Sequence, residues 1–190
     1  MLLNTVKYRG WLGAVLILLA TPLWAISPLG RDYQKLSTVN SSDNLAIAIE
    51  LLQGHGDPSL SGKAADLLLP LVEKGSVQAT LWLGRAYRDG LGGVEKNTEK
   101  AFGYFMQAAG RSGKNAEAQY ELGRAYYLGE GTDRNLISAY IWTTLSLQQP
   151  SSVTEQAAKQ KEALAELLNS EQIKTAKALV DQMIGIYLVQ

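Results

Sequence analysis

One phrase occurs twice in the middle of the chain. The first copy, LGRAYRDGLGGVEKNTEKAFGYF, starts at Leu83, and the second, LGRAYYLGEGTDRNLISAYIW, starts at Leu122. A unit that recurs at a fixed spacing is normally one supersecondary element that cannot bury its apolar face alone and has to stack on copies of itself. The doubled phrase therefore predicts a solenoid.

Each copy has the pattern of two helices joined by a turn. In the first copy Ala79, Leu83 and Tyr87 lie four residues apart and so share one helical face; the second copy repeats this pattern from Ala118. Each first helix is followed by a Gly-x-Gly pair, which predicts a turn because glycine adopts the left-handed conformation that ends a helix. The helix-turn-helix unit is therefore expected to be the building block.

Four further positions refine this unit. Gly84 and Gly123 lie inside the first helices, where glycine costs about 1 kcal/mol relative to alanine. We therefore expect another helix to pass too closely for a side chain. The second helices are expected to begin at Asn97 and Asn135, whose side chains can accept the free amides of a first turn.

These residues resemble the repeat unit of Sel1-like repeat proteins, which are related to the tetratricopeptide repeat proteins. That unit runs Ala-x3-Leu-Gly-x2-Tyr-x2-Gly-x-Gly, followed by a Lys-Ala step, an Ala-Ala pair and a closing Gly. The first copy matches it at Ala79, Leu83, Gly84, Tyr87, Gly90, Gly92, Lys100, Ala101, Ala108, Ala109 and Gly113. The second copy has Ser138 in place of the lysine, and Ser146 and Leu147 in place of the alanine pair.

The resemblance implies an all-α fold, an α/α solenoid of Sel1-like helix-turn-helix repeats. The nearest rival is the tetratricopeptide unit itself, and the Gly-x-Gly turn and longer spacing favour the Sel1 type. The repeats are expected to occupy residues 43–149, with clear copies at 79–113 and 118–149. A degenerate copy is expected at 43–75, where a Gly-x-Gly pair starts at Gly54.

Beyond the repeats, residues 150–190 are predicted to form two helices that cap the array, because a terminal repeat has to cover its apolar face. The alternative is an amphipathic helix that binds a partner. Ser152 and Glu155 are expected to form a capping box at the start of the first of these helices. Residues 26–42 are a polar lead-in that is expected to be poorly ordered.

Residues 1–25 have the features of a secretory signal peptide. Lys7 and Arg9 precede an apolar stretch, and Ala25 provides a small residue at the predicted cleavage site. The apolar segment is shorter than the roughly 20 residues that span a bilayer, so we expect cleavage and no stable membrane span afterwards. The predicted location is the periplasm of a Gram-negative bacterium; the alternative is an inner-membrane protein anchored by an uncleaved signal.

Charge and composition disfavour several classes of function. The chain has 18 basic and 18 acidic residues and no cysteine, so it lacks both the basic excess typical of nucleic-acid binding and any thiolate site. Its single histidine, His55, lies in a predicted turn without the partners that catalysis needs. We therefore expect no enzyme activity, no cofactor, no metal and no nucleic-acid partner, with a hydrolase as the least favoured alternative.

The residues that bind a partner are expected among the side chains of the first helices that do not belong to the core. These candidate partner-binding residues are Trp82, Arg85, Arg88, Glu121, Arg124 and Tyr127. Arg85 and Arg124 occupy equivalent positions without an obvious packing reason, and we expect them side by side on the concave face of the array. The alternative is that they are ordinary solvated arginines.

The resemblance implies a non-enzymatic scaffold or adaptor, which we expect to bind another protein of the bacterial cell envelope. Similar proteins serve in assembly, secretion, signalling and stress pathways. The alternative is a peptidoglycan- or glycan-binding module that uses exposed rings as stacking platforms. The candidate rings are Trp82, Tyr104, Tyr127 and Trp142.

Overall fold

The computed structural model describes residues 41–56, 58–112 and 114–187. The predicted signal peptide, and the predicted lead-in up to residue 40, lie outside these residues. The described residues form one compact unit. Within the described part of the chain, no helix combines the length and the apolar character needed to cross a membrane.

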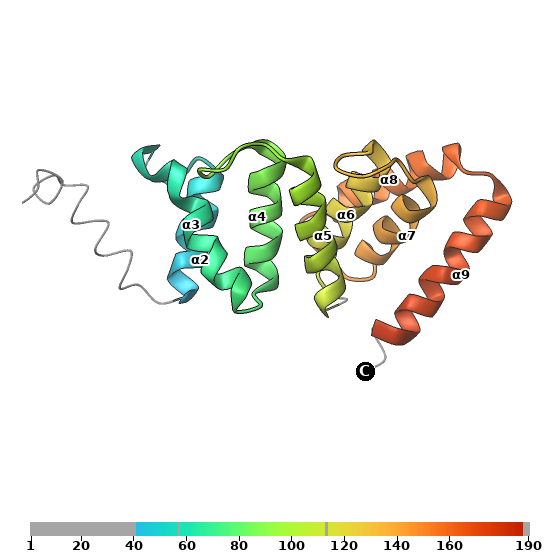
Figure 1. The fold of residues 1–190 in the computed structure, drawn as a ribbon. Helices are drawn as coiled ribbons and strands as arrows, with labels where there is room; N and C mark the ends of the chain where they lie inside the picture. The colour runs from blue at the N-terminus through green and yellow to red at the C-terminus, as the bar shows by residue number, and fades with distance from the viewer. Residues whose placement is uncertain (1–40, 57, 113, 188–190) are drawn as a thin grey trace, which may run out of the picture. The chain divides into compact units, whose positions relative to one another are not determined.

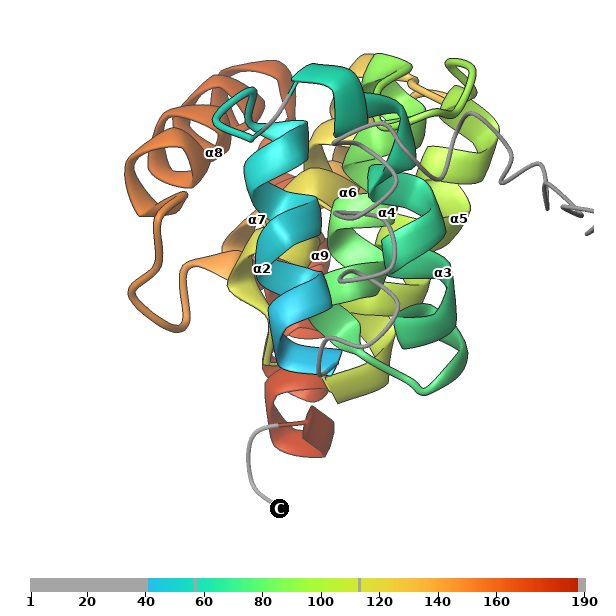
Figure 2. The ribbon, with the colours of Figure 1, turned by 90° about the vertical axis from the view of Figure 1, so that its left-hand side faces the viewer.

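The described residues form helices and no strands. In chain order these are α2 (Ser41–Leu52), the 3-10 helix η2 (Pro58–Lys63), α3 (Ala64–Glu73), α4 (Val77–Asp89), α5 (Thr98–Ser112), α6 (Ala116–Leu128), α7 (Leu136–Ser146), α8 (Thr154–Leu167) and α9 (Ser170–Tyr187). From α2 to α8 each α-helix packs on the next one along the chain (Figure 1). Figure 2 shows α2 and α3 side by side in front of the later helices. The predicted all-α helical solenoid is confirmed.

Side-chain caps set the starts of the repeat helices. The Asn97 side-chain oxygen accepts a hydrogen bond from the backbone N–H of Lys100 at 2.8 Å, and the Asn135 oxygen accepts one from Ser138 at 2.9 Å. Both predicted N-caps are confirmed. Ser76 and Asn115 cap α4 and α6 in the same way.

Glycine ends both first helices. Gly90 and Gly129 have φ angles of 70° and 73°, in the left-handed region that a side chain disfavours. Their backbone N–H groups donate to the carbonyl oxygens of Ala86 and Ala125, four residues earlier. The predicted turns are therefore confirmed.

The glycines inside the first helices allow close contact with the second helices. A Cβ on Gly84 would lie 2.7 Å from the Phe105 ring of α5, and one on Gly123 would lie 2.7 Å from Thr143 Oγ1 of α7. Real Cβ atoms do not approach other atoms so closely, so each glycine sets the distance between the two helices of its repeat.

Three clusters of buried side chains run through the unit. The first joins α2, α3 and α4 and contains Leu68 and Leu83; the next joins α4, α5 and α6 and contains Leu81 and Phe105. The last joins α7, α8 and α9 and contains Leu164. Because α4 contributes to two clusters through opposite sides of one helix, the core continues from one repeat to the next.

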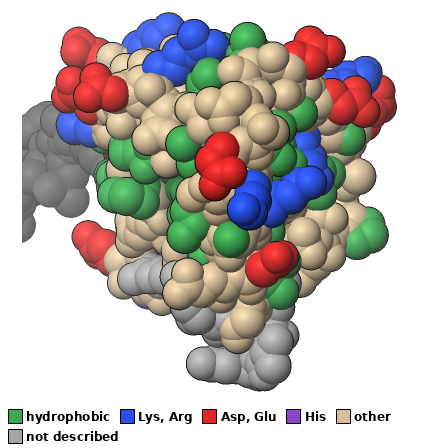
Figure 3. Space-filling view, turned by 90° about the vertical axis from the view of Figure 1, so that its right-hand side faces the viewer, with side chains coloured by type: hydrophobic (Ala, Val, Ile, Leu, Met, Phe, Trp, Pro, Cys, Tyr) green, Lys and Arg blue, Asp and Glu red, His purple; other side chains and the backbone are tan. Residues whose placement is uncertain are grey.

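The last two helices pack against α7. Leu164 of α8, Leu168 at the C-cap of α8, and Ala176 and Val180 of α9 are buried against it. The surface on the side where α9 lies carries basic and acidic side chains, with hydrophobic ones scattered between them (Figure 3). The two helices therefore cover the apolar side of the last repeat with a largely polar surface.

The start of α8 differs from the prediction. Its N-cap residue is Val153, which makes no side-chain cap, so the predicted capping box of Ser152 and Glu155 is wrong. Thr154 instead accepts a hydrogen bond from the backbone N–H of Ser151 at 2.9 Å. Ser152 lies one residue before the N-cap, and its hydroxyl points to another helix, as described below.

Candidate functional site

The six predicted partner-binding residues lie on the first helices of neighbouring repeats. Trp82, Arg85 and Arg88 belong to α4, while Glu121, Arg124 and Tyr127 belong to α6. The structure brings Arg85, Arg88 and Glu121 into direct contact. It places Arg124 and Tyr127 in separate local contacts.

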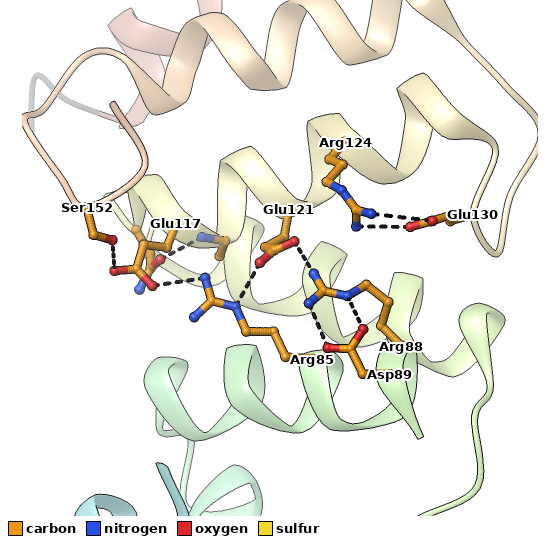
Figure 4. A network of polar contacts seen from close by, with 10 residues as sticks. Arg85, Arg88, Asp89, Glu117, Glu121, Arg124, Glu130 and Ser152 are labelled. Carbon is orange, nitrogen blue, oxygen red and sulfur yellow. Dashed lines mark hydrogen bonds and ion pairs between the residues drawn. The ribbon is translucent and has the colours of Figure 1, made fainter. Parts of the chain in front are cut away.

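Glu121 is the centre of the contact between the two repeats. Its Oε1 accepts a hydrogen bond from Arg85 Nε at 2.7 Å, and its Oε2 accepts one from Arg88 Nη1 at 2.6 Å (Figure 4). The two guanidinium groups cover the carboxylate, leaving its side chain only 6% exposed. The expectation that Glu121 is a surface residue is therefore wrong, and its burial is stable because both oxygens are paired with cations.

Arg85 extends this contact in two directions. Its Nη2 lies 3.1 Å from Glu117 Oε2, and the other oxygen of Glu117 accepts a hydrogen bond from the Ser152 hydroxyl at 2.7 Å (Figure 4). The guanidinium carbon of Arg85 also lies 4.7 Å from the centre of the Trp82 ring. These contacts join α4, α6 and the segment before α8. We call Arg85, Arg88, Asp89, Glu117, Glu121 and Ser152 the inter-repeat network.

Asp89 holds the far end of the network. Arg88 donates to it through Nε and Nη2, both at 2.8 Å, in a bidentate arrangement. These hydrogen bonds hold the pKa of Asp89 below its usual value and raise the pKa of Arg88 above its own. Arg88 therefore remains a cation shared between Asp89 and the buried Glu121.

Arg124 occupies the position equivalent to Arg85 but pairs differently. Its Nη1 lies 3.0 Å from Glu130 Oε2, in the turn after its own helix. Arg124 thus pairs within its own repeat, whereas Arg85 pairs across to the next one. Both arginines are paired with carboxylates, Arg85 with Glu117 and Glu121 and Arg124 with Glu130. Arg124 is the more accessible of the two, with 30% of its side chain exposed against 16% for Arg85.

The candidate stacking rings are half-buried. Trp82 and Tyr104 pack against the first core cluster, and Tyr127 and Trp142 against the last one. Tyr104 also stacks on Tyr87, with ring centroids 5.6 Å apart, and its burial raises the pKa of its hydroxyl. Each ring therefore uses part of its surface in packing.

The described residues contain no group of three or more histidine, aspartate or glutamate side chains that could hold a metal ion. His55 is exposed in the turn after α2. The site offers paired charges and half-buried rings, which suit recognition of another surface.

Four residues of the site were not predicted from the sequence. These are Asp89, Glu117, Glu130 and Ser152. A signal for one of them, Glu117, was present: Arg85 and Arg88 lie three apart on one helix, and Glu117 and Glu121 lie four apart on the other, so each pair shares a helical face. Complementary pairs on neighbouring repeats indicate a contact between them.

Comparison with known proteins agrees with this architecture. The Sel1 repeat family model matches residues 77–111 and 116–150. Among solved structures, a protective antigen present in uropathogenic Escherichia coli strains, which displays an SLR (Sel1-like repeat) fold, is similar with a TM-score of 0.69 and 22% identity. The similarity covers 82% of this chain and 32% of the antigen, so this chain spans about a third of that protein's length.

A Sel1 repeat protein from Oxalobacter formigenes is also similar, with a TM-score of 0.52 and 24% identity over 70% of this chain and 98% of that one. No curated protein matches the chain. The resemblance found in the doubled phrase is thus confirmed by two repeat matches and by the fold of two solved structures. The chain contains two Sel1 repeats, and its helical part has the fold of Sel1-like repeat proteins.

Proposed function

We propose that this chain is a non-enzymatic scaffold that binds a partner protein through the surface of α4 and α6. Sel1 repeats generally act as protein–protein interaction scaffolds. The observation that carries the proposal is the inter-repeat network, which joins the two first helices through Glu121. We define the α4–α6 surface by the side chains of Trp82, Arg85, Arg88, Arg124 and Tyr127.

The network supports binding because it orders the surface before a partner arrives. Arg85 and Arg88 are held by ion pairs and keep 16% and 20% of their side chains exposed. A partner that contacts them loses little additional side-chain entropy on binding. Arginine and tryptophan are also the residues that most often carry the binding energy of protein interfaces.

We propose further that the scaffold works in the bacterial cell envelope. The support is the basic segment, apolar stretch and small residue of residues 1–25. Intact-mass measurement of the protein purified from its native host tests this step. A mature chain that begins at Ile26 is expected, and a species that retains Met1 would instead support the inner-membrane anchor.

Site-specific photocrosslinking in living cells tests the binding surface. Gln78 is exposed on α4, one helical turn before Trp82, so a photoreactive phenylalanine analogue there lies beside the α4–α6 surface without breaking the network. The matched control places the same analogue at Lys174, which is exposed on α9. We expect a protein adduct from position 78 and none from position 174. Equal labelling from both positions, or none from 78, would refute this surface as the binding site.

Glycan binding is the competing function. Because Trp82 and Trp142 use part of their rings in packing, the structure gives it less support. A soluble peptidoglycan fragment that blocks the adduct at position 78 would favour glycan recognition over a protein partner.

A further inference from the structure

A hollow lies on the opposite side of α4 from the inter-repeat network. Tyr87 borders it, and Tyr87 is two residues from Arg85, which is about 200° of rotation around the helix. The hollow has two adjoining parts with cavity volumes of about 260 and 280 Å³, which share Tyr87 and Lys100. We call it the α4–α5 hollow. It is separate from the surface proposed above.

Stacked rings support one wall of the hollow. Tyr87 and Tyr104 lie with their rings 15° from parallel, and the Lys100 ammonium lies 5.1 Å from the centre of the Tyr87 ring. A cation over an aromatic face is attracted by the ring, which keeps this ammonium beside the hollow. Gln107 adds a side-chain amide farther along the same face of α5.

The charge of the lining favours an anion. Lys96 and Lys100 both line the hollow, against one carboxylate, that of Glu95. Within the described part of the chain neither lysine forms a salt bridge, in contrast to Arg85, Arg88 and Arg124. Each ammonium has three donors and is exposed. The charge of Lys96 also helps to lower the pKa of Asp89, so Lys100 is the main cation for a carboxylate from outside.

The hollow is open because α5 has a glycine there. A Cβ built on Gly103 would have no other atom within 4 Å, so no close packing requires this glycine. At the equivalent positions of the second repeat Ser138 replaces Lys100 and Ile141, which is buried, replaces Gly103. The second repeat thus lacks both the α5 lysine and the space, and at the position equivalent to Lys96 it has Arg134, whose Nε donates to the Tyr127 carbonyl oxygen.

We propose that the α4–α5 hollow is a receptor site for an aspartate or glutamate side chain in an acidic segment of a partner protein. The carboxylate pairs with Lys100 and Lys96, and the stem of the acidic side chain packs on the Tyr87 ring beside Gly103. This site goes beyond the proposed α4–α6 surface and does not depend on it, because the two lie on opposite sides of α4.

Fluorescence anisotropy of a labelled hexaglutamate peptide, with hexaglutamine as the uncharged comparison, tests the proposal on the purified protein. We expect hexaglutamate alone to bind. Lys100→Gln removes the central cation and is expected to weaken binding about fivefold. Gly103→Leu fills the hollow and is expected to weaken binding at least as much, while the helix-favouring substitution leaves α5 intact by circular dichroism.

The matched control is Lys177→Gln, which removes the same charge from an exposed position on α9. It is expected to change the affinity less than twofold. Equal effects of Lys100→Gln and Lys177→Gln would show that the peptide is attracted by the overall charge of the protein, which would overturn the proposal. Unchanged binding by Gly103→Leu, or no binding by the wild type, would also overturn it. Displacement of the peptide by inorganic polyphosphate at equal charge concentration would overturn the assignment to a carboxylate. Arg124→Glu should leave peptide binding unchanged, which separates this site from the α4–α6 surface.

Discussion

Glu121→Gln removes the negative charge that Arg85 and Arg88 share while keeping the size of the side chain. The glutamine carbonyl can accept a hydrogen bond from one guanidinium, but its amide then faces the other one. The two cations lose their common counter-ion at a position where the carboxylate is 6% exposed. We expect the folded state to be destabilised without a change of architecture.

The size of the effect follows from the burial of the three groups. Breaking a fully buried ion pair typically costs about 3–5 kcal/mol. Here the arginine side chains are 16% and 20% exposed, so water can solvate part of the charge that is left unpaired. We therefore expect a loss of about 2 kcal/mol in the free energy of unfolding. For a chain of this length that corresponds to a decrease in Tm of about 4–8 °C.

Urea and thermal unfolding followed by circular dichroism at 222 nm measure this change. The control is Glu155→Gln, because Glu155 forms an i,i+4 pair with Lys159 at 2.6 Å in which both side chains are more than 70% exposed. The free energy of unfolding of that variant should fall by about 0.5 kcal/mol or less. If Glu121→Gln stays within about 0.5 kcal/mol of the wild type, the network does not couple the repeats and the reasoning is refuted.

Three further changes test the rest of the fold. Gly123→Leu should lower the free energy of unfolding by about 2–4 kcal/mol in urea titrations, because the first added carbon meets Thr143; unchanged stability would contradict the close helix contact. Asn135→Ala should cost about 1 kcal/mol through loss of the α7 cap, and Asn135→Ser should recover most of it. Since the Arg88 hydrogen bonds lower the folded pKa of Asp89, their stabilisation is present above its ordinary pKa of about 4 and is lost as the pH falls toward the lower folded value. Asp89→Asn should therefore make the free energy of unfolding depend less on pH in the acid range. An unchanged pH dependence would count against the pairing of Arg88 with Asp89.

Local features of the fold could be predicted from the sequence because they depend on neighbours along the chain. A helix cap such as Asn97 bonds a backbone amide three residues away, and the glycine at the end of α4 is required by its own φ angle. The role of Gly84 and Gly123 could likewise be predicted, since a glycine at the equivalent position of both repeats indicates close helix packing.

The ion pairs could not be predicted in the same way. Arg85 and Glu121 lie 36 residues apart, and their contact depends on the distance and rotation between two stacked helices. The failed capping box has the same cause: Ser152 satisfies its hydroxyl with Glu117, 35 residues away, and not with the amides beside it. The two arginines without an obvious packing reason in the sequence form ion pairs: Arg85 with the next repeat, and Arg124 with the turn of its own repeat.

The affinity of the crosslinked partner for variants of the α4–α6 surface tests the central claim most directly. Arg124→Glu reverses a charge that is 30% exposed and lies outside the inter-repeat network, so the fold should survive. Lys174→Glu makes the same reversal on α9. We predict that Arg124→Glu weakens partner binding about tenfold or more while Lys174→Glu leaves it unchanged. Equal affinity of the wild type and Arg124→Glu would contradict the scaffold surface proposed here.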